Sequence, residues 1–331
     1  MQIDSVRELK ALVTKSLIAP SALAAGRALG IGIAAQSLDT LSTVHRTMAL
    51  GIIKKGKNNF HLAVRLQRRE MEASPELARL KRQAKREINI QYIGRLVKRA
   101  IPWHQRRNRP LRIGGSIGHF KITAGTLGCF VRDRVTQDTW ILSNNHVLAN
   151  ENGATKGDAV IQPGDFDGGT RPADVVGALE RFITLNSKSA NLVDCAIASI
   201  KAGIKFNAKK ITGLGNVAGL GPDFLDQGTL VHKLGRTTGL TKGRVTAFEL
   251  DNVVVGYDIG NLRFDNQIEI EGAGANSFSE GGDSGSLIVD EDRLAVGLLF
   301  AGGDTGGTNG KGLTYANPIS SVLDRLKIDL L

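Results

Sequence analysis

The sequence predicts a mainly β protein, with a helical segment and a small α/β module ahead of the β-rich part. From about residue 113 onward, short apolar runs recur between glycine, asparagine and aspartate residues, which is typical of an antiparallel barrel or sandwich. Before that point, helical and strand-like apolar spacings alternate. The chain has 331 residues, of which 41% are hydrophobic, so it has room for more than one domain. Its 40 glycines and 8 prolines indicate a globular, loop-rich protein.

The N-terminal residues 1–44 are predicted to form a helical segment. Residues 4–17 (DSVRELKALVTKSL) place apolar side chains at helical spacing behind an Asp-Ser pair that suits an N-cap. A second helical stretch is expected after Pro20. No apolar run reaches eighteen residues, so no membrane span is predicted. A signal peptide is not expected either, because Asp4 and Glu8 lie where a basic leader would be.

A small basic α/β module with a linker is predicted over residues 45–112. Two strands flank the turn Lys54–Asn59, and the second strand alternates apolar and polar residues. The following helix begins with a capping Ser74 and a proline at the first helical position. The string INIQYIGRLV, which starts at Ile88, is expected to be a third strand. The basic, proline-bounded stretch 101–112 then forms the linker.

The net charge of +11 is concentrated in this N-terminal third. Residues 1–112 contain 23 Lys and Arg against 7 Asp and Glu, a balance of +16, so the remainder carries −5. Seven of the bases lie between Arg95 and Arg112. Such a run of basic residues could bind nucleic acid or an anionic surface. It is also typical of a solvated connector, or of a patch that docks on an acidic partner domain. Trp103 is its only stacking aromatic residue, which disfavours nucleic acid.

The two cysteines of the chain, Cys129 and Cys195, both fall in strand-like segments. A secreted protein of this size usually carries several cysteine pairs, so two thiols favour a cytoplasmic location. Neither cysteine has metal-ligand spacing, and both are expected to be buried as small apolar residues. The sequence therefore predicts no metal and no cofactor.

Three residue types that suit nucleophilic catalysis occur in the β-rich part of the chain. Ser284 lies in SEGGDSGSLIV, where glycines let main-chain N–H groups crowd around a reacting atom. His146 follows the strand-like WILS, and Asp194 lies in NLVDCAIASI on a strand face with small residues. A buried carboxylate needs a partner, and a histidine N–H would serve. A serine becomes a good nucleophile when a histidine takes its proton and a carboxylate fixes that histidine.

The order His146, Asp194, Ser284, with intervals of 48 and 90 residues, resembles the chymotrypsin-fold (trypsin-like) serine peptidases. The similar strings, in order, are AGTLGCFV, WILSNNHVLA, NLVDCAIASI, KLGRTTGLTKGRV, EGGDSGSLIV and AVGLLFAGG. The resemblance covers about residues 113–326 and implies two antiparallel six-stranded β-barrels in a peptidase domain of residues 113–331. The module ahead of it resembles the extra module of some single-chain, non-secreted relatives, and the GRTTGLTKGRV hairpin resembles that of small bacterial members.

The resemblance also implies a role for each matching residue. Ser284 would be the nucleophile, His146 the general base and then acid, and Asp194 the residue that orients His146. The backbone N–H groups of Gly282 and Ser284 would form the oxyanion hole.

The sequence departs from the family pattern at several points. Ser286 and Leu287 follow GDSG, where the family usually has glycine and proline. Many relatives are activated by cleavage, and the new N-terminus pairs with the residue that corresponds to Asp283. No activation site precedes TAGTLG here, so Asp283 is expected to find a partner inside the chain. Relatives also place a small polar residue near the catalytic aspartate, in a region that reads Leu299–Gly303 here and has none.

The primary substrate pocket of this fold is built from the stretch before the serine, the strand after it and a later turn. No acidic residue lies unmistakably at its floor, which favours a small or medium apolar side chain before the scissile bond. The predicted pocket residues are Phe278, Glu280, Phe300, Ala301, Gly302 and Gly312.

The predicted function is a serine endopeptidase that cleaves protein or peptide substrates through an acyl-enzyme intermediate. We expect it to be intracellular, with an N-terminal module that restrains, targets or oligomerises it and that has a possible acidic partner. Two alternatives remain open, namely an inactive peptidase-fold scaffold and a basic nucleic-acid-associated binding protein. The oligomeric state is unknown.

Overall fold

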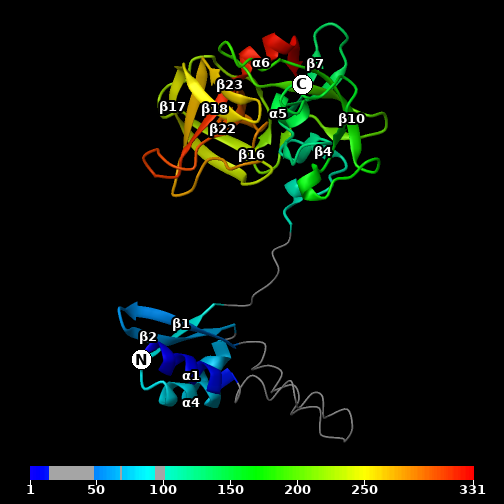
Figure 1. Cartoon of the computed structure of the whole chain (residues 1–331). Coiled ribbons are helices and arrows are strands. Elements are labelled where there is room, and N and C mark those ends of the chain that lie inside the picture. The colour runs from blue at the N-terminus through cyan, green and yellow to red at the C-terminus, as the bar shows by residue number, and fades with distance from the viewer. Residues whose placement is uncertain (15–47, 68, 94–100) are drawn as a thin grey trace, which may run out of the picture. The chain divides into compact units, whose positions relative to one another are not determined.

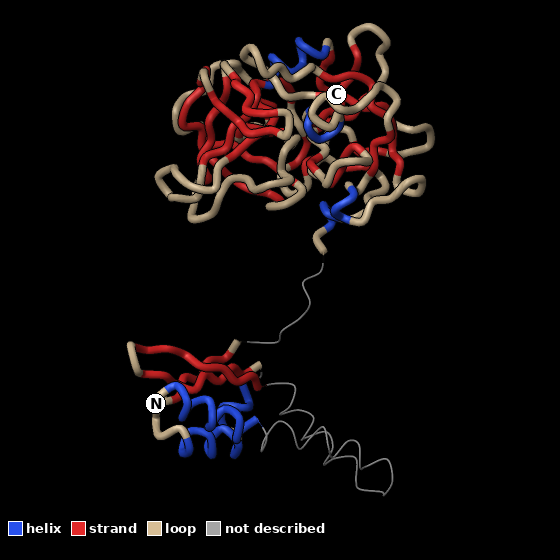
Figure 2. Tube along the Cα trace, in the orientation of Figure 1, coloured by secondary structure: helices blue, strands red, loops and turns tan. Residues whose placement is uncertain are grey.

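The computed structural model divides the chain into two compact units, Met1–Ala100 and Ile101–Leu331. Figure 1 labels their elements, and Figure 2 shows that strands dominate the second unit. The structure describes residues 1–14, 48–67, 69–93 and 101–331. The predicted helix after Pro20 and the basic residues from Arg95 to Arg99 lie outside the described residues.

The N-terminal unit is a three-stranded sheet with helices. Its elements are α1 (Ile3–Val13), β1 (Met48–Gly56), β2 (Asn59–Leu66), η2 (Arg69–Ala73), α4 (Pro75–Gln83) and β3 (Ile88–Tyr92). The strand order is β1-β2-β3, in which β1 and β2 are antiparallel and β2 and β3 are parallel. Ser74 caps α4, since its Oγ accepts a hydrogen bond from the N–H of Leu77 at 3.2 Å. Apolar residues of both helices and of the sheet form the core of this unit, including Val6, Leu62, Val64, Leu66, Leu77 and Leu80.

Residues 101–112, predicted as a linker, belong to the second unit. This stretch contains η3 (Trp103–Gln105) and β4 (Leu111–Arg112), and β4 pairs with β12 (Phe206–Asn207). Leu111 is fully buried in the main hydrophobic cluster of that unit. The boundary therefore lies about twelve residues before the predicted start at residue 113, because an apolar side chain and a strand pairing anchor the basic stretch.

The first sheet of the second unit is a curled, eight-stranded half-barrel with the order β24-β7-β8-β11-β10-β9-β5-β6. Its neighbouring strands are antiparallel. Its strands are β5 (Ser116–His119), β6 (Gly125–Thr126), β7 (Cys129–Asp133), β8 (Thr139–Ser143), β9 (Ala159–Ile161), β10 (Val175–Phe182), β11 (Ala196–Ser199) and β24 (Ile328–Leu330). Two short helices, α5 (Asn145–Leu148) and η4 (Asp165–Asp167), lie in its connections.

The second sheet closes into a six-stranded barrel, because β22 pairs with both β21 and β23. Its strands are β16 (Leu230–Gly235), β17 (Gly239–Leu250), β20 (Gln267–Gly272), β21 (Leu287–Asp290), β22 (Leu294–Gly302) and β23 (Leu313–Pro318). The short strand β15 (Gly219–Leu220) extends it beside β22, and helix α6 (Ile319–Leu326) leads from β23 back to β24 of the first sheet. Figure 1 shows the half-barrel in teal to green beside the closed barrel in yellow to orange. This arrangement confirms the prediction of a mainly β, chymotrypsin-like two-barrel fold.

A two-stranded hairpin projects from the closed barrel between β17 and β20. It consists of β18 (Val253–Tyr257) and β19 (Gly260–Phe264). A second small pair, β13 (Lys210–Ile211) and β14 (Gly215–Asn216), lies in the connection between the two sheets. Among the helices that the structure describes, none is long and apolar enough to cross a membrane.

Candidate active site

His146 lies on the single turn of α5, directly after strand β8. The preceding residue fixes this turn, because Asn145 Nδ2 donates to Asn152 Oδ1 and to the carbonyl of Ile183, both at 2.8 Å. Three consecutive non-glycine residues, 150–152, have φ angles of 49°, 51° and 70°, so the loop after the helix is strained. Backbone strain of this kind persists where surrounding contacts impose it. The loop returns the chain so that Asn152 meets Asn145.

Asp194 is fully buried and receives several hydrogen bonds. His146 Nδ1 lies 2.5 Å from its Oδ2, and the hydroxyl of Tyr257 donates to the same oxygen at 2.7 Å. Its Oδ1 accepts the backbone N–H groups of Asn145 at 2.6 Å and of His146 at 3.3 Å. The carboxylate is thus saturated by donors, which is the condition for burying a charge without a large loss of stability.

The surroundings of His146 change its pKa in opposing directions. Burial lowers it, but the charge of Asp194, the hydrogen bond to that carboxylate and the charge of Glu151 outweigh the burial. The net result is a pKa raised above 6.5. Within the described part of the chain, the second ring nitrogen, Nε2, has no hydrogen-bond partner, and His146 lines an open cavity. An imidazole oriented by a carboxylate through Nδ1 can accept a proton at Nε2.

The glycines around Ser284 are required by the backbone. Gly282 has a φ of +94°, and a Cβ at this position would lie 2.6 Å from Thr237 Oγ1. Gly285 has a φ of +91°, and a Cβ there would lie 2.1 Å from Ser143 Oγ. Both positions therefore exclude other residues by conformation and by contact.

The loop that carries Ser284 packs against the strands that lead to His146. The N–H of Thr126 donates to the carbonyl of Ser284 at 2.8 Å. A Cβ at Gly125 would lie 2.4 Å from a methyl carbon of Val147 and 3.1 Å from that same carbonyl oxygen. The backbone of the serine and the residue after His146 thus meet across a glycine.

The hydroxyl of Ser284 and two backbone N–H groups of its loop have few hydrogen-bond partners. Ser284 Oγ has one distant contact, 3.5 Å from the carbonyl of Phe300. Among the described residues, no acceptor is bonded to the backbone N–H of Gly282 or of Ser284. Backbone N–H groups without an acceptor, close in sequence to a nucleophile, are the kind of donor that can stabilise a developing oxyanion.

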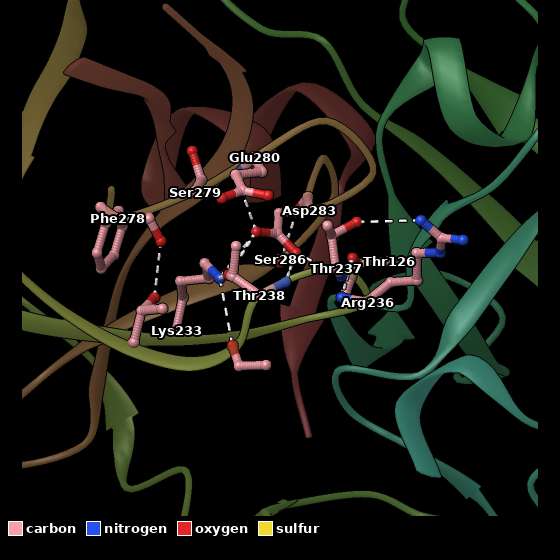
Figure 3. A network of polar contacts seen from close by, with 12 residues as sticks. Thr126, Lys233, Arg236, Thr237, Thr238, Phe278, Ser279, Glu280, Asp283 and Ser286 are labelled. Atoms are coloured by element: carbon pink, nitrogen blue, oxygen red, sulfur yellow. Dashed lines mark hydrogen bonds and ion pairs between the residues drawn. The ribbon is translucent and has the colours of Figure 1, made fainter. Parts of the chain in front are cut away.

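Asp283, the residue before the serine, pairs with Lys233 of β16, and both side chains are fully buried (Figure 3). Lys233 Nζ lies 3.0 Å from Asp283 Oδ2 and also contacts the hydroxyl of Thr238. Asp283 further accepts the hydroxyl of Thr238 at 2.6 Å and three backbone N–H groups, those of Thr237, Thr238 and Glu280. Burial lowers the pKa of Lys233, and the charge of Asp283 opposes this change.

The turn after β16 connects Asp283 to the start of the second unit. The carbonyl of Arg236 lies 2.6 Å from His104 Nδ1 and accepts Gln105 Nε2 at 3.1 Å. The N–H of Arg236 donates to Thr126 Oγ1, whose hydroxyl donates to the carbonyl of Gly282. Three successive hydrogen bonds therefore link His104 and Gln105 to the serine loop, through Arg236 and Thr126.

Two cavities open beside these residues. One, of about 530 Å³, has His146 in its wall together with residues 121–124, residues of the loop after α5 and the hairpin tip Asp258–Ile259. The other, of about 620 Å³, is lined by residues 250–256, by Ala301, Gly302 and Gly303, and by Tyr315.

The structure separates the predicted pocket residues. Ala301 and Gly302 line the second cavity. The side chains of Phe278 and Phe300 are buried in hydrophobic clusters instead. Glu280 is exposed. Gly312 lies so close to the backbone of Gly303 that a Cβ at this position would overlap the carbonyl oxygen of Gly303.

Sequence reasoning missed two residues that contact this region. The sequence pattern could have indicated Lys233, because it lies on the same face of β16 as the buried Val231. A lysine at a core position requires a buried partner. Tyr257 had no such signal, because it lies on a hairpin whose contact with Asp194 depends on tertiary structure alone.

The chain is similar to several known proteins. Solved structures that resemble the chain include protease A from Thermobifida fusca, with 19% identity over 67% of this chain and 98% of that one, at a TM-score of 0.45. A glutamic acid-specific serine protease shares 19% sequence identity over 67% of this chain and 100% of that one, with a TM-score of 0.47. The chymotrypsin of Cellulomonas bogoriensis shares 20% sequence identity over 67% of this chain and 98% of that one, with a TM-score of 0.45. A search of curated proteins finds no match.

The sequence itself decides the family. Residues 128–326, more than half of the chain, match the family model described as Trypsin. That interval contains His146, Asp194 and Ser284 in the order predicted above. The chain therefore belongs to the trypsin family and is a serine-type endopeptidase.

Proposed function

We propose that this endopeptidase hydrolyses peptide bonds through Ser284, His146 and Asp194 by way of an acyl-enzyme intermediate. The observation that carries the proposal is the 2.5 Å contact between His146 Nδ1 and the buried carboxylate of Asp194. This contact fixes the ring so that Nε2 is the nitrogen left to exchange protons.

In the first half of the reaction, Ser284 Oγ attacks the scissile carbonyl carbon and its proton passes to His146 Nε2. Asp194 stabilises the resulting imidazolium through the Nδ1–H hydrogen bond. The carbonyl oxygen becomes an oxyanion that receives the N–H groups of Gly282 and Ser284. One such donor typically contributes a factor of about 10²–10³ in rate.

The tetrahedral intermediate then breaks. His146 returns the proton to the leaving amine, the C–N bond cleaves, and the acyl group stays on Ser284 Oγ. Water repeats the sequence with His146 as the base, which releases the acid and restores the serine hydroxyl.

We propose that substrate residues before the scissile bond occupy the cavity beside Ala301–Gly303. The apolar residues in its wall, among them Leu250, Val253 and Val254, support a preference for an apolar side chain on this side. Profiling of cleaved peptides tests this preference, and dominant cleavage beside charged residues would contradict it.

We further propose that the site forms without prior cleavage of the chain. In relatives activated by cleavage, a new N-terminus neutralises the aspartate before the serine, whereas Lys233 supplies that positive charge here. The three backbone N–H groups that reach Asp283 fix the same loop from the other side. An intact, full-length chain is therefore expected to be reactive.

A serine-reactive fluorophosphonate probe tests the triad on the full chain. We expect one adduct, on Ser284, in intact protein, and no labelling of the Ser284→Ala variant. Labelling of His146→Ala should slow by more than about 10³-fold, because the hydroxyl then lacks its base. Ser321→Ala, on helix α6, is the matched control and should label normally. A folded wild-type chain that neither labels nor cleaves peptides would favour the inactive scaffold instead.

We also propose that the protein acts in the cytoplasm and that its N-terminal unit targets or restrains the peptidase by binding an acidic partner. Both cysteines are buried and free, and burial raises the pKa of the Cys129 thiol to about 12. The excess of basic residues in the N-terminal third supports an acidic partner. Cell fractionation and salt-dependent retention on polyglutamate against nucleic acid test these two points. An extracellular protein, or equal retention on both polymers, would contradict them.

A further inference from the structure

The carboxylate of Asp194 has a donor that the family pattern does not supply. Relatives place a small polar residue near this aspartate, on the strand that reads Leu299–Gly303 here. In this chain the hydroxyl of Tyr257 donates to Asp194 Oδ2 at 2.7 Å, the same oxygen that His146 Nδ1 contacts. Tyr257 ends strand β18 and so comes from the hairpin rather than from β22.

The ring of Tyr257 contacts two other rings. It makes an edge-to-face contact with His146, with centroids 5.8 Å apart at 76°. It also stacks on Phe264, with centroids 5.9 Å apart, and the Phe264 ring in turn packs on that of Phe300 at 4.6 Å. The backbone carbonyl of Phe300 lies 3.5 Å from Ser284 Oγ, so the residue whose ring ends this series also contacts the serine.

The hairpin that carries Tyr257 is anchored at its base and at its tip. At the base, the carbonyl of Arg263 accepts the N–H of Asn191 at 2.8 Å. Asn191 lies three residues before Asp194 in the chain. At the tip, the N–H of Ile259 donates to Glu151 Oε2 at 3.1 Å, in the strained loop after α5. The hairpin thus links the closed barrel to the segments that carry Asp194 and His146.

We propose that Tyr257 is a positioning residue of the triad, which acts through Asp194 to set the orientation and basicity of the His146 imidazole. This inference rests on the proposed function of the three residues. Burial and the nearby charge of Asp194 raise the pKa of the tyrosine hydroxyl well above 10, so it remains a donor at every working pH. A donor on Oδ2 withdraws charge that would otherwise stabilise the imidazolium, and it also fixes the carboxylate in the plane of the ring.

The test is the rate of Ser284 phosphonylation by a fluorophosphonate in the full chain, measured as a function of pH. In this reaction the Ser284 Oγ–P bond forms, fluoride leaves, and His146 takes the serine proton, so the pH midpoint reports the His146 pKa. We expect Tyr257→Phe to slow labelling by about tenfold or more, since it removes one hydrogen bond to a charged group. Its pH midpoint should rise, because the full charge of Asp194 then faces the imidazole.

Tyr92→Phe, which removes an exposed hydroxyl in the N-terminal unit, is the matched control and should change neither quantity more than twofold. A purely structural role for Tyr257 would lower the thermal midpoint and leave the pH midpoint unchanged. Wild-type rate and pH midpoint in a folded Tyr257→Phe variant would overturn the inference. If wild-type protein itself is not labelled on Ser284, the proposed function fails first.

A second measurement keeps the ring and works even if Tyr257→Phe does not fold. The double variant Tyr92→Phe, Tyr315→Phe leaves position 257 as the single tyrosine, since the chain has three. Incorporation of 3-fluorotyrosine makes that hydroxyl more acidic and its hydrogen bond to Asp194 stronger. The pH midpoint should then fall relative to the same variant with ordinary tyrosine. No shift, or an upward shift, would overturn the inference.

Discussion

Asp194 and Asp283 are two fully buried carboxylates in the same unit, and they are neutralised in different ways. Asp194 receives an imidazole, a phenol and two backbone N–H groups, none of which is a permanent cation. Asp283 receives the ammonium group of Lys233, a threonine hydroxyl and three backbone N–H groups. The first charge stays available to stabilise a proton on His146, whereas the second is balanced permanently and holds a loop in shape.

The comparison shows that the number of hydrogen bonds does not decide what a buried aspartate does. What decides it is whether a partner can change its own charge within the working range of pH. His146 can, because an imidazole takes up a proton, and the charge of Asp194 and the hydrogen bond to it raise the pKa of this ring. Activity should therefore fall as pH drops through that raised pKa, since protonated His146 cannot act as a base.

The largest effect is expected from Asp194→Asn. The amide retains an acceptor for the backbone N–H groups of Asn145 and His146 but cannot fix the required tautomer of the imidazole. The labelling rate should fall by about 10⁴-fold, with little change in the thermal midpoint. A loss below tenfold would show that Asp194 is not coupled to His146 as proposed.

The next largest effect is expected from Lys233→Met, which leaves Asp283 buried without its cation. The free energy of unfolding should fall by about 3–5 kcal/mol, measured by chemical denaturation, and labelling of Ser284 should decrease with it. Lys242→Met, which breaks the exposed pair with Glu291, is the matched control and should cost about 1 kcal/mol or less. Equal losses in both variants would contradict a special role for the buried pair.

The smallest effect is expected from Glu151→Gln. The amide oxygen still accepts the N–H of Ile259, but the negative charge that helps to raise the His146 pKa is removed. The His146 pKa should fall, so the acid limb of the labelling rate moves to lower pH, and this change should shrink at higher salt. Glu291→Gln serves as the control for an exposed carboxylate, and an upward shift in Glu151→Gln would be the wrong sign.

The sequence predicted the two-barrel fold and the candidate triad because these depend on local strings. A strand, a turn and a few fixed residues define WILSNNHVLA or EGGDSGSLIV, and each occurs within a dozen positions. The glycine-rich string around Ser284 also shows locally that the backbone needs unusual freedom, and Gly282 has a φ of +94° in the structure. The assignment of roles to these residues stays a prediction until the variants are measured.

Other features could not be predicted, because they depend on contacts between distant segments. Tyr257 and Asp194 are 63 residues apart, and nothing in VVVGYDIG indicates a catalytic neighbour. The predicted pocket residues depend on tertiary structure in the same way. Phe278 and Phe300 lie in the strings from which the pocket was predicted, but their side chains are buried in hydrophobic clusters. Residues 101–112 were predicted to be a linker from their basic composition, and composition does not indicate that Leu111 is buried.

The contact of His104 and Gln105 with the carbonyl of Arg236 affects how the catalytic half could be separated from the rest. A shortened protein that starts at residue 113 would discard this contact together with Leu111, and the turn that bonds Asp283 would lose one of its supports. A shortened protein that starts at Ile101 would keep both. The basic residues 101–112 thus belong structurally to the second unit, although their composition is typical of a linker.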